Sequence, residues 1–527
     1  DALERLAPTL EKYKGCDIID LNPGIGLWSS RLHEFLQPRS HILVEPHPHT
    51  YMPKLRPLLD APDSKYRLVA ENGMNWAHME KILGPEYLPH QESLSLGDPG
   101  LGKLNTTLLV VANIGANNPR RFLKFASLGS VVIYQFLSAM RTHALFQQYG
   151  KVRMLIWMNP SDAKMMPRNV AHRKKTALEA LASCEHIEII VDADHSEYFG
   201  REKNLDIQRV YLVVKKMEEN CVRIPEGRET FMLNAMRAGK TGQEIEELCP
   251  KNLQKELQDM KEAYAQGDFG KDLIDSDGCH VSRKQLTKKT PEYERMCELG
   301  RRYRRRINKS KDLSRLANTF QNILALYRKS RLITDATELN TVLKEIESLS
   351  VDWKKSLKSI SPFDAAELQY MCDNRRCFSQ TPPGLFWDRR EAEPMKAKSN
   401  EFYPERTLCL FDFRPRMMPS SSHDPAFHDV LSFLVTQFCL TPSQSLGEAL
   451  ESLAPGAKEF LISNCPSLTD PLKNGCPDLD LFSARCITSE MLFEMCEAWL
   501  KWPFKPHRHE TLYRTGSDAY SEETEQN

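Results

Sequence analysis

Residues 17–32 read DIIDLNPGIGLWSSRL, an apolar run that passes through Asn-Pro-Gly-Ile-Gly into a segment with helical character. A strand that leads through such a loop into a helix leaves backbone N–H groups and the positive end of the helix dipole free to meet a ligand. Glycine has no Cβ to hold a ligand away from the main chain. Gly24 and Gly26 are therefore predicted to form a ligand-binding loop, with a simple tight turn as the alternative.

Two acidic residues strengthen the prediction of a ligand site. Asp20 ends the first predicted strand, and Glu45 ends the next one, in HILVEP. An acidic side chain at the second position can accept the hydroxyl groups of a ribose. The third glycine of a dinucleotide fingerprint would fall at position 29, which is serine. The pattern therefore favours S-adenosylmethionine over NAD, while a solvated strand end is the alternative for Glu45.

The first part of the chain alternates predicted strands with helices, which indicates a doubly wound, mostly parallel α/β sheet of the Rossmann-like type. The predicted strands are 17–21, 41–44, 66–69, 107–112, 152–157, 185–191 and 208–214, and predicted helices include 28–36 and 119–126. We expect this domain to span residues 1–216.

Helical periodicity dominates further along the chain. We expect a helical, basic domain at 226–350, a mixed but mainly helical region at 361–506, and a disordered polar tail at 507–527. Within the third region, GLFWDRREAEP at 384–394 is predicted to be a structured loop, anchored by Trp387, in which Asp388 pairs with an arginine.

Composition limits the class of protein. The chain has 527 residues, 71 basic and 71 acidic, and no apolar run of membrane-spanning length. The 14 cysteines contain no CxxC pair, which indicates reduced thiols rather than a disulfide framework or a zinc site. We predict no metal site, because His47 and His49 lie in a proline-rich loop. The first residue is Asp1, which is typical of a processed or fragmentary form.

These features together resemble the family of rRNA adenine dimethyltransferases and their relatives, the mitochondrial transcription factors of the B type. IIDLNPGIGLWSSRL is similar to the family's first cofactor motif, ILVEP to its ribose-binding strand, and LVAENGMNW to the segment that meets the cofactor's adenine. The resemblance covers roughly residues 10–215 and implies a class I methyltransferase sheet. The residues that it implies for binding S-adenosylmethionine are Asp20, Asn22, Gly24, Gly26, Glu45, Glu71, Asn72 and Asn113.

The predicted catalytic loop departs from the family's pattern of Asn, aliphatic, Pro and aromatic. In ANIGANNP, Asn113 and Ile114 agree with it, but Gly115 and Ala116 replace the proline and the aromatic residue. The aromatic ring matters because stacking contributes about 1–3 kcal/mol per base. At the adenine pocket, Asn72 stands where the family has an acidic residue. We therefore expect methylation to be lost, with Asn113 the remaining catalytic candidate and cofactor binding vestigial.

This departure favours the transcription-factor branch of the family. The resemblance then implies a mitochondrial matrix protein that initiates transcription by binding promoter DNA and the mitochondrial RNA polymerase. Two alternatives stay open. One is an active S-adenosylmethionine-dependent rRNA adenine N6-dimethyltransferase, and the other is a structural protein associated with the mitochondrial ribosome.

Two basic stretches are predicted to contact nucleic acid, because clustered arginines and lysines favour contacts with phosphate groups. A solvated surface is the alternative for both. The residues are Arg120, Arg121 and Lys124 after the Asn113 loop, and Arg301, Arg302, Arg304, Arg305 and Arg306 in the helical region.

Overall fold

The computed structural model describes residues 1–116, 127–193, 200–240, 244, 258–259, 261–262 and 291–518. The chain divides into two compact units. The first unit consists of Asp1–Arg201, Gln208–Leu233 and Asp373–Asn527, and the second of Glu202–Ile207 and Asn234–Cys372. The second unit is therefore an insertion in the sequence of the first.

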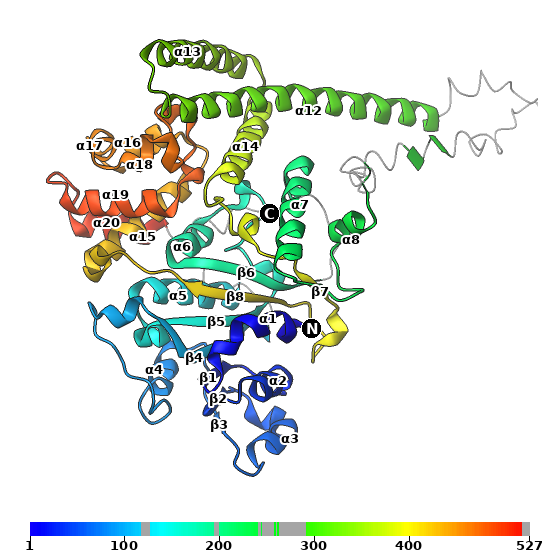
Figure 1. Ribbon diagram of the computed structural model, residues 1–527, viewed down its shortest axis with the longest axis vertical. Helices are drawn as coiled ribbons and strands as arrows, with labels where there is room; N and C mark the ends of the chain where they lie inside the picture. Colours follow the sequence, from blue (N-terminus) through cyan, green and yellow to red (C-terminus); the bar gives the residue numbers. More distant parts are fainter. Residues whose placement is uncertain are drawn as a thin grey trace, which may run out of the picture. The chain divides into compact units, whose positions relative to one another are not determined.

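The first unit is built on one sheet of eight strands in the order β3-β2-β1-β4-β5-β8-β6-β7 (Figure 1). The strands are β1 (Asp17–Leu21), β2 (Ser40–Val44), β3 (Tyr66–Val69), β4 (Leu104–Asn113), β5 (Lys151–Met158), β6 (Cys184–Ala193), β7 (Met395–Ala397) and β8 (Cys409–Pro415). Strand β8 is antiparallel to β5 and β6, and the other neighbouring pairs are parallel. The prediction of a mostly parallel α/β sheet is confirmed.

Helices of the first unit cover the sheet and extend from it. They are α1 (Ala2–Leu10), α2 (Leu27–Leu36), α3 (Pro48–Leu59), α4 (Trp76–Ile82), α5 (Leu128–Thr142), α6 (Lys175–Ser183), α15 (Pro425–Leu440), α16 (Leu446–Leu453), α17 (Ala457–Asn464), α18 (Pro466–Thr469), α19 (Ser489–Lys501) and α20 (Arg508–Asp518). Helices α7 (Lys203–Glu219) and α8 (Phe231–Arg237) belong to this unit over residues 208–219 and 231–233. On one face of the sheet, buried leucines of α1 and α2 form a core with Val213 and Met217 of α7. This core holds the start of α2 at the end of β1.

The predicted strand at 208–214 is wrong, because these residues belong to helix α7. Val210, Val213 and Met217 are buried, whereas Tyr211 and Leu212 between them are exposed. Spacings of three and four residues place the buried side chains on one helical face, which a short apolar run does not reveal by itself. The last strands of the sheet, β7 and β8, come instead from the third predicted region. The first predicted domain, 1–216, therefore does not contain the whole sheet.

The predicted disordered tail also differs from the structure over residues 508–518, which form α20. Arg514 anchors this helix, because its guanidinium donates to Leu453 O and to Gln437 Oε1, each at 2.7 Å. The predicted helix at 119–126 and residues 519–527 lie outside the described part of the chain.

The second unit is helical in the part that the structure describes, as predicted. It contains α12 (Pro291–Ser330), α13 (Ala336–Ser359) and the first turns of α14 (Pro362–Ser379). Helices α12 and α13 pack together through buried Ile323, Val342 and Ile346, and the ring centroids of Phe320 and Trp353 are 5.4 Å apart.

A buried ion pair fixes β8 between its neighbours. Arg153 of β5 donates to both carboxylate oxygens of Asp412 of β8, at 2.7 and 2.8 Å, and the two side chains are 2% and 0% exposed. The remaining Arg153 donors reach Thr9 O at 3.0 Å and Thr9 Oγ1 at 2.8 Å. Arg414 also donates to Asp412 Oδ2, at 2.9 Å. The network therefore ties α1, β5 and β8 together.

Replacing Asp412 with Asn is expected to destabilise the chain by about 3–5 kcal/mol, because it leaves the buried Arg153 guanidinium without a counter-charge. The free energy of unfolding from urea titration measures this loss. The matched control is Arg414→Gln, whose side chain is 37% exposed; surface ion pairs contribute about 1 kcal/mol or less. Equal losses in the two variants would contradict the role given to the buried pair.

Candidate functional site

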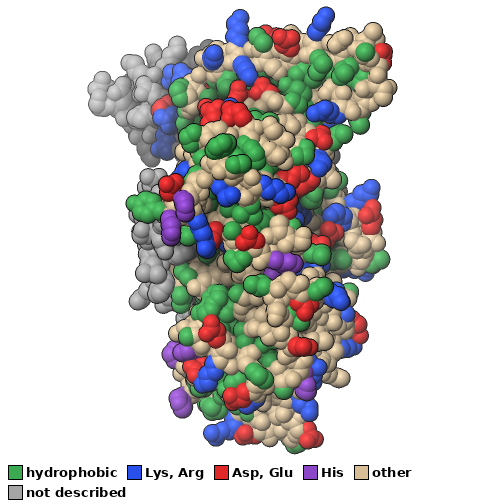
Figure 2. Space-filling view, turned by 90° about the vertical axis from the view of Figure 1, so that its left-hand side faces the viewer, with side chains coloured by type: hydrophobic (Ala, Val, Ile, Leu, Met, Phe, Trp, Pro, Cys, Tyr) green, Lys and Arg blue, Asp and Glu red, His purple; other side chains and the backbone are tan. Residues whose placement is uncertain are grey.

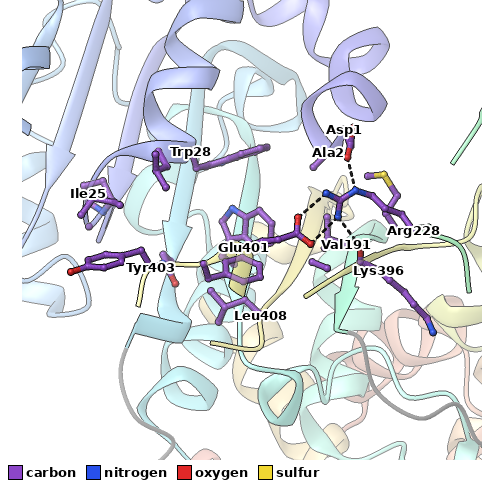
Figure 3. Close-up of a pocket in the computed structure, with 18 residues that line it drawn as sticks. Asp1, Ala2, Ile25, Trp28, Val191, Arg228, Lys396, Glu401, Tyr403 and Leu408 are labelled. Atoms are coloured by element: carbon purple, nitrogen blue, oxygen red, sulfur yellow. Dashed lines mark hydrogen bonds and ion pairs between the residues drawn. The ribbon is translucent and has the colours of Figure 1, made fainter. Parts of the chain in front are cut away.

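A cavity of about 320 Å³ lies at the carboxyl ends of the central strands (Figure 3). Its walls include the glycine loop after β1, Asn113 at the end of β4, Trp157 of β5, Val191 of β6 and Leu408 just before β8. The strand order reverses between β1 and β4, and doubly wound sheets bind ligands in the crevice at such a switch point. The cavity is thus where this architecture favours a ligand site.

Gly24 and Gly26 have different structural roles in the loop. Gly26 has φ of +74° and precedes α2, and a Cβ there would lie only 3.1 and 3.2 Å from the side chains of Leu58 and Leu55. Gly24 has φ of +60° with nothing within 4 Å of the position of a Cβ, and it lines the cavity. Gly26 is therefore required by packing, whereas Gly24 leaves space for a ligand.

The two acidic residues predicted for the cofactor are buried behind the loop, and neither is among the residues that line the cavity. Asp20 accepts a hydrogen bond of 2.5 Å from the Ser29 hydroxyl and so fixes the first turn of α2. Glu45 accepts from the backbone N–H groups of Gly24 and His47, each at 3.1 Å. Burial raises the pKa of Glu45, and these two N–H groups partly offset it. Both carboxylates shape the loop.

Two asparagines bring unused acceptors to the site. The Asn22 amide donates to Asn113 O at 3.2 Å, which joins the ends of β1 and β4. The side-chain oxygens of Asn22 and Asn113 are buried and accept no hydrogen bond within the described part of the chain, and the indole N–H of Trp28 is likewise unpaired. Buried polar atoms are normally satisfied. These three groups therefore fit a ligand that carries both hydrogen-bond donors and acceptors.

The loop after Asn113 is closed by a segment from far along the chain. A Cβ on Gly115 would lie 2.4 Å from the Leu408 side chain and 3.2 Å from the backbone nitrogen of Asn159. Arg406 donates to Gly115 O at 2.9 Å. Any residue with a Cβ at this position would require Leu408 to move, so glycine here is explained by packing.

Aromatic rings that the sequence analysis missed border the cavity. Trp28 meets Trp157 edge to face with centroids 5.6 Å apart, and Phe402 meets Trp157 at 5.4 Å. Tyr403 is 72% exposed at the rim, near Ile25 in Figure 3. The rings of Phe402 and Tyr403 come from a segment almost 300 residues after Asn113, so no local motif around the catalytic loop indicates them.

A charged cluster forms the opposite wall of the cavity (Figure 3). Arg228 pairs with Glu401 at 2.7 Å and with the carboxylate of Asp1 at 2.5 Å, and it donates to Lys396 O at 3.0 Å. Glu401, Phe402 and Tyr403 belong to one short segment between β7 and β8. Arg228 therefore fastens that segment to the sheet unit.

The predicted adenine-binding residues lie apart from the cavity lining. Glu71 pairs with His78 at 3.1 Å and with Lys81 at 3.3 Å. Asn72 is exposed, and its side-chain oxygen accepts from Met74 N at 3.0 Å. Both residues shape the turn between β3 and α4.

The predicted nucleic-acid contacts are divided between described and undescribed residues. Arg120, Arg121, Lys124 and the side chain of Arg306 lie outside the described part. Arg301, Arg302, Arg304 and Arg305 are exposed on α12. Arg302 pairs with Glu298 at 2.5 Å. On the face that Figure 2 presents, basic and acidic side chains are interspersed.

The predicted loop at 384–394 is confirmed as a structured element. Asp388 accepts two hydrogen bonds from Arg201, at 2.8 and 2.5 Å, with both side chains fully buried. Trp387 packs against the guanidinium groups of Arg168 and Arg390, whose carbons are 4.3 and 3.9 Å from the ring centroid. The loop is a packing anchor at the end of β6.

No protein-family model matches the sequence, and a search of curated proteins found no match. Among the described residues, no helix has both the length and the apolar character needed to cross a bilayer.

A stack of rings behind the glycine loop makes the fold sensitive to acid. His33 and His41 are stacked with their Nδ1 atoms 3.1 Å apart, and Tyr66 stacks on both. Burial and the neighbouring His41 lower the pKa of His33 to about 4. His41 also lies 3.5 Å from Asp20, so the stack supports the residue that fixes α2.

The native state is expected to lose stability as the pH falls from about 6.5 towards 4, because in that range the unfolded chain binds a proton on His33 that the folded chain excludes. In His33→Asn, which cannot titrate, the urea midpoint should decline less over this range. The exposed His49→Asn is the control and should follow the wild type. Parallel declines in wild type and His33→Asn would refute the assignment.

Proposed function

We propose that this chain is a mitochondrial transcription initiation factor on a methyltransferase-like scaffold, which binds S-adenosylmethionine but does not use it to methylate a base. The observation that carries the proposal is the closure of the loop after Asn113. Leu408 fills the space beside Gly115, and Arg406 donates a hydrogen bond to the carbonyl oxygen of Gly115. The loop therefore serves to hold a distant segment of the chain, whereas a methylating loop must hold the target base.

The cavity and the asparagines at its edge fit S-adenosylmethionine. Gly24 leaves room for the ligand, and the free side-chain oxygens of Asn22 and Asn113 can accept from its amino and hydroxyl groups. When bound, S-adenosylmethionine supplies an electrophilic methyl group. An adenine amino group is a weak nucleophile, and a misplaced reacting atom can cost about a hundredfold in rate. A loop fastened to Arg406 and Leu408 is not free to position that group.

Binding of nucleic acid is supported by the exposed arginines of α12. Four exposed guanidinium groups within five residues give a dense positive charge, and the Glu298 side chain that pairs with Arg302 is itself exposed. Exposed ion pairs are weak, so phosphate groups can displace them. The polymerase partner and the mitochondrial location rest on the family resemblance of the sequence.

An active rRNA adenine N6-dimethyltransferase is the second candidate, and the aromatic rings of the cavity favour it. Tyr403 and Phe402 provide a stacking surface that the catalytic loop itself lacks, and the Asn113 side-chain oxygen is free to accept from an amino group. Methyl transfer from S-adenosylmethionine to rRNA by the purified chain, abolished in Asn113→Ala, would establish this candidate in place of the first.

The glycine loop gives a direct test of cofactor binding. Gly24→Asn is expected to lower the affinity for S-adenosylmethionine at least about tenfold, because asparagine tolerates positive φ but its side chain would enter the ligand space. Isothermal titration calorimetry measures the affinity. Gly15→Asn is the matched control, because Gly15 also has positive φ and open space but lies before β1. If wild type does not bind, the loop is only a turn.

Reconstituted transcription tests the proposed function as a whole. Adding the chain to mitochondrial RNA polymerase is expected to raise initiation at promoter DNA, and no effect would overturn the proposal. The quadruple replacement of Arg301, Arg302, Arg304 and Arg305 with Gln should weaken duplex binding. It should also lower the slope of log K against log salt by up to about 3–4, because each phosphate contact contributes about 0.9.

The control for the arginines replaces two exposed lysines of α13, Lys344 and Lys355, with Gln. It changes the charge of the same unit and should leave the salt dependence nearly unchanged. Equal slopes for the quadruple variant and the wild type would show that the α12 arginines form a solvated face.

A further inference from the structure

Two thiols are buried together in the first unit, away from the cavity. Cys377 lies in the last turns of α14, and Cys486 ends a short 3₁₀ helix, Ala484–Cys486. Both side chains are completely buried, and both cysteines are reduced. Arg173 lies beside both of them, with its Nη1 atom near Cys377 Sγ and hydrogen-bonded to the carbonyl oxygen of Arg485.

The surrounding contacts bring the two cysteine segments together. The Cys486 thiol donates to Asp373 O at 3.8 Å, one helical turn before Cys377 on α14. Arg173 donates to the carbonyl oxygens on either side of Cys486, at 2.6 and 2.8 Å, and its Nη1 lies 4.0 Å from Cys377 Sγ. One guanidinium group thus touches both cysteine segments.

Arg173 also makes the two thiols unequal. The residue is 3% exposed, and within the described part of the chain its hydrogen bonds go to carbonyl oxygens and to Cys377, with no carboxylate among them. A buried cation favours a nearby anion. The neighbouring Cys486 thiol and the charge of Arg173 lower the pKa of Cys377, whereas burial raises the pKa of Cys486 well above its usual value.

The loop that ends at Gly384 packs directly on Cys377. The Gly384 N–H donates to Cys377 O at 2.7 Å, and a Cβ on Gly384 would lie 3.1 Å from Cys377 Sγ. Thr381 and Pro382, at the tip of this loop, are exposed. Lifting the loop by local opening would admit a small molecule to Cys377, and exposed loops open at little cost in free energy.

We propose that Cys377 and Cys486 form a redox-sensitive pair that hydroperoxides convert into a reversible disulfide. The Cys377 thiolate attacks the peroxide oxygen, which gives a sulfenic acid and releases hydroxide or alkoxide. The Cys486 sulfur then attacks the sulfenic sulfur, forms the S–S bond and expels water. With hydrogen peroxide, two thiols and one peroxide give one disulfide and two waters, and a thiol reductant reverses the step. Such a pairing of a low-pKa thiol with a resolving thiol is typical of redox-sensitive cysteines.

The disulfide would join α14 to the segment before α19. Asp373 is the first residue of the segment in which the chain returns from the second unit to the first. The disulfide would therefore cross-link the first unit at the start of that segment. Oxidation is therefore expected to raise the melting temperature of the first unit, since a cross-link restricts the unfolded chain.

Mass spectrometry of the full chain tests the proposal. The reduced protein is treated with hydrogen peroxide under native conditions, its remaining thiols are alkylated, and it is digested without reductant. We expect a peptide pair that links Cys377 to Cys486 and that dithiothreitol separates. In Cys486→Ser, Cys377 should accumulate as a sulfenic acid that dimedone traps, whereas Cys377→Ser should leave Cys486 reduced.

Two other cysteines serve as internal references. Cys465 is equally buried but has acidic neighbours, and burial raises its pKa to about 12, so it should stay reduced. Cys221 is exposed and reports that the oxidant is active. If Cys221 is oxidised while Cys377 and Cys486 stay unlinked, or if the link forms only in urea, the proposal is wrong. This outcome is independent of S-adenosylmethionine and nucleic acid.

Discussion

The ion pair between Arg153 and Asp412 is the constraint on which the sheet depends. Strand β8 separates β5 from β6 in the strand order, so β6 and β7 join the rest of the sheet only through β8. The wall of the cavity that carries Val191 and Met395 is built on those two strands. A buried pair costs desolvation energy, but a register slip would leave both charges unmatched. The ligand cavity thus depends on a contact with β8.

The local pattern of the sequence predicts the first six strands well and the rest poorly. Each of those strands is a short apolar run between turn signals, which is a local property. The run at 208–214 has the same composition, but it forms part of α7 because its buried side chains share a helical face. Strands β7 and β8 belong to the sheet through pairing with residues more than 200 positions away, which no local pattern encodes.

The candidate site, like the sheet, was only partly predictable from local sequence patterns. The glycine loop and Asn113 could be predicted because a strand end and a turn fix their positions. The closing of the Asn113 loop by Arg406 and Leu408 could not, because it depends on which distant segment packs there. At Gly115 the structure leaves no room for a larger residue, because a Cβ there would lie 2.4 Å from the Leu408 side chain.

The long separation between β5 and β8 has a consequence for biosynthesis. Arg153 and Asp412 are 259 residues apart, so the edge of β5 emerges from the ribosome long before its partner strand exists. At about 5–20 residues per second, this delay is about 13–50 s. Throughout it the nascent sheet presents an unpaired apolar edge, which is a template for aggregation. Pairing across such a separation also raises the contact order, which slows folding in general.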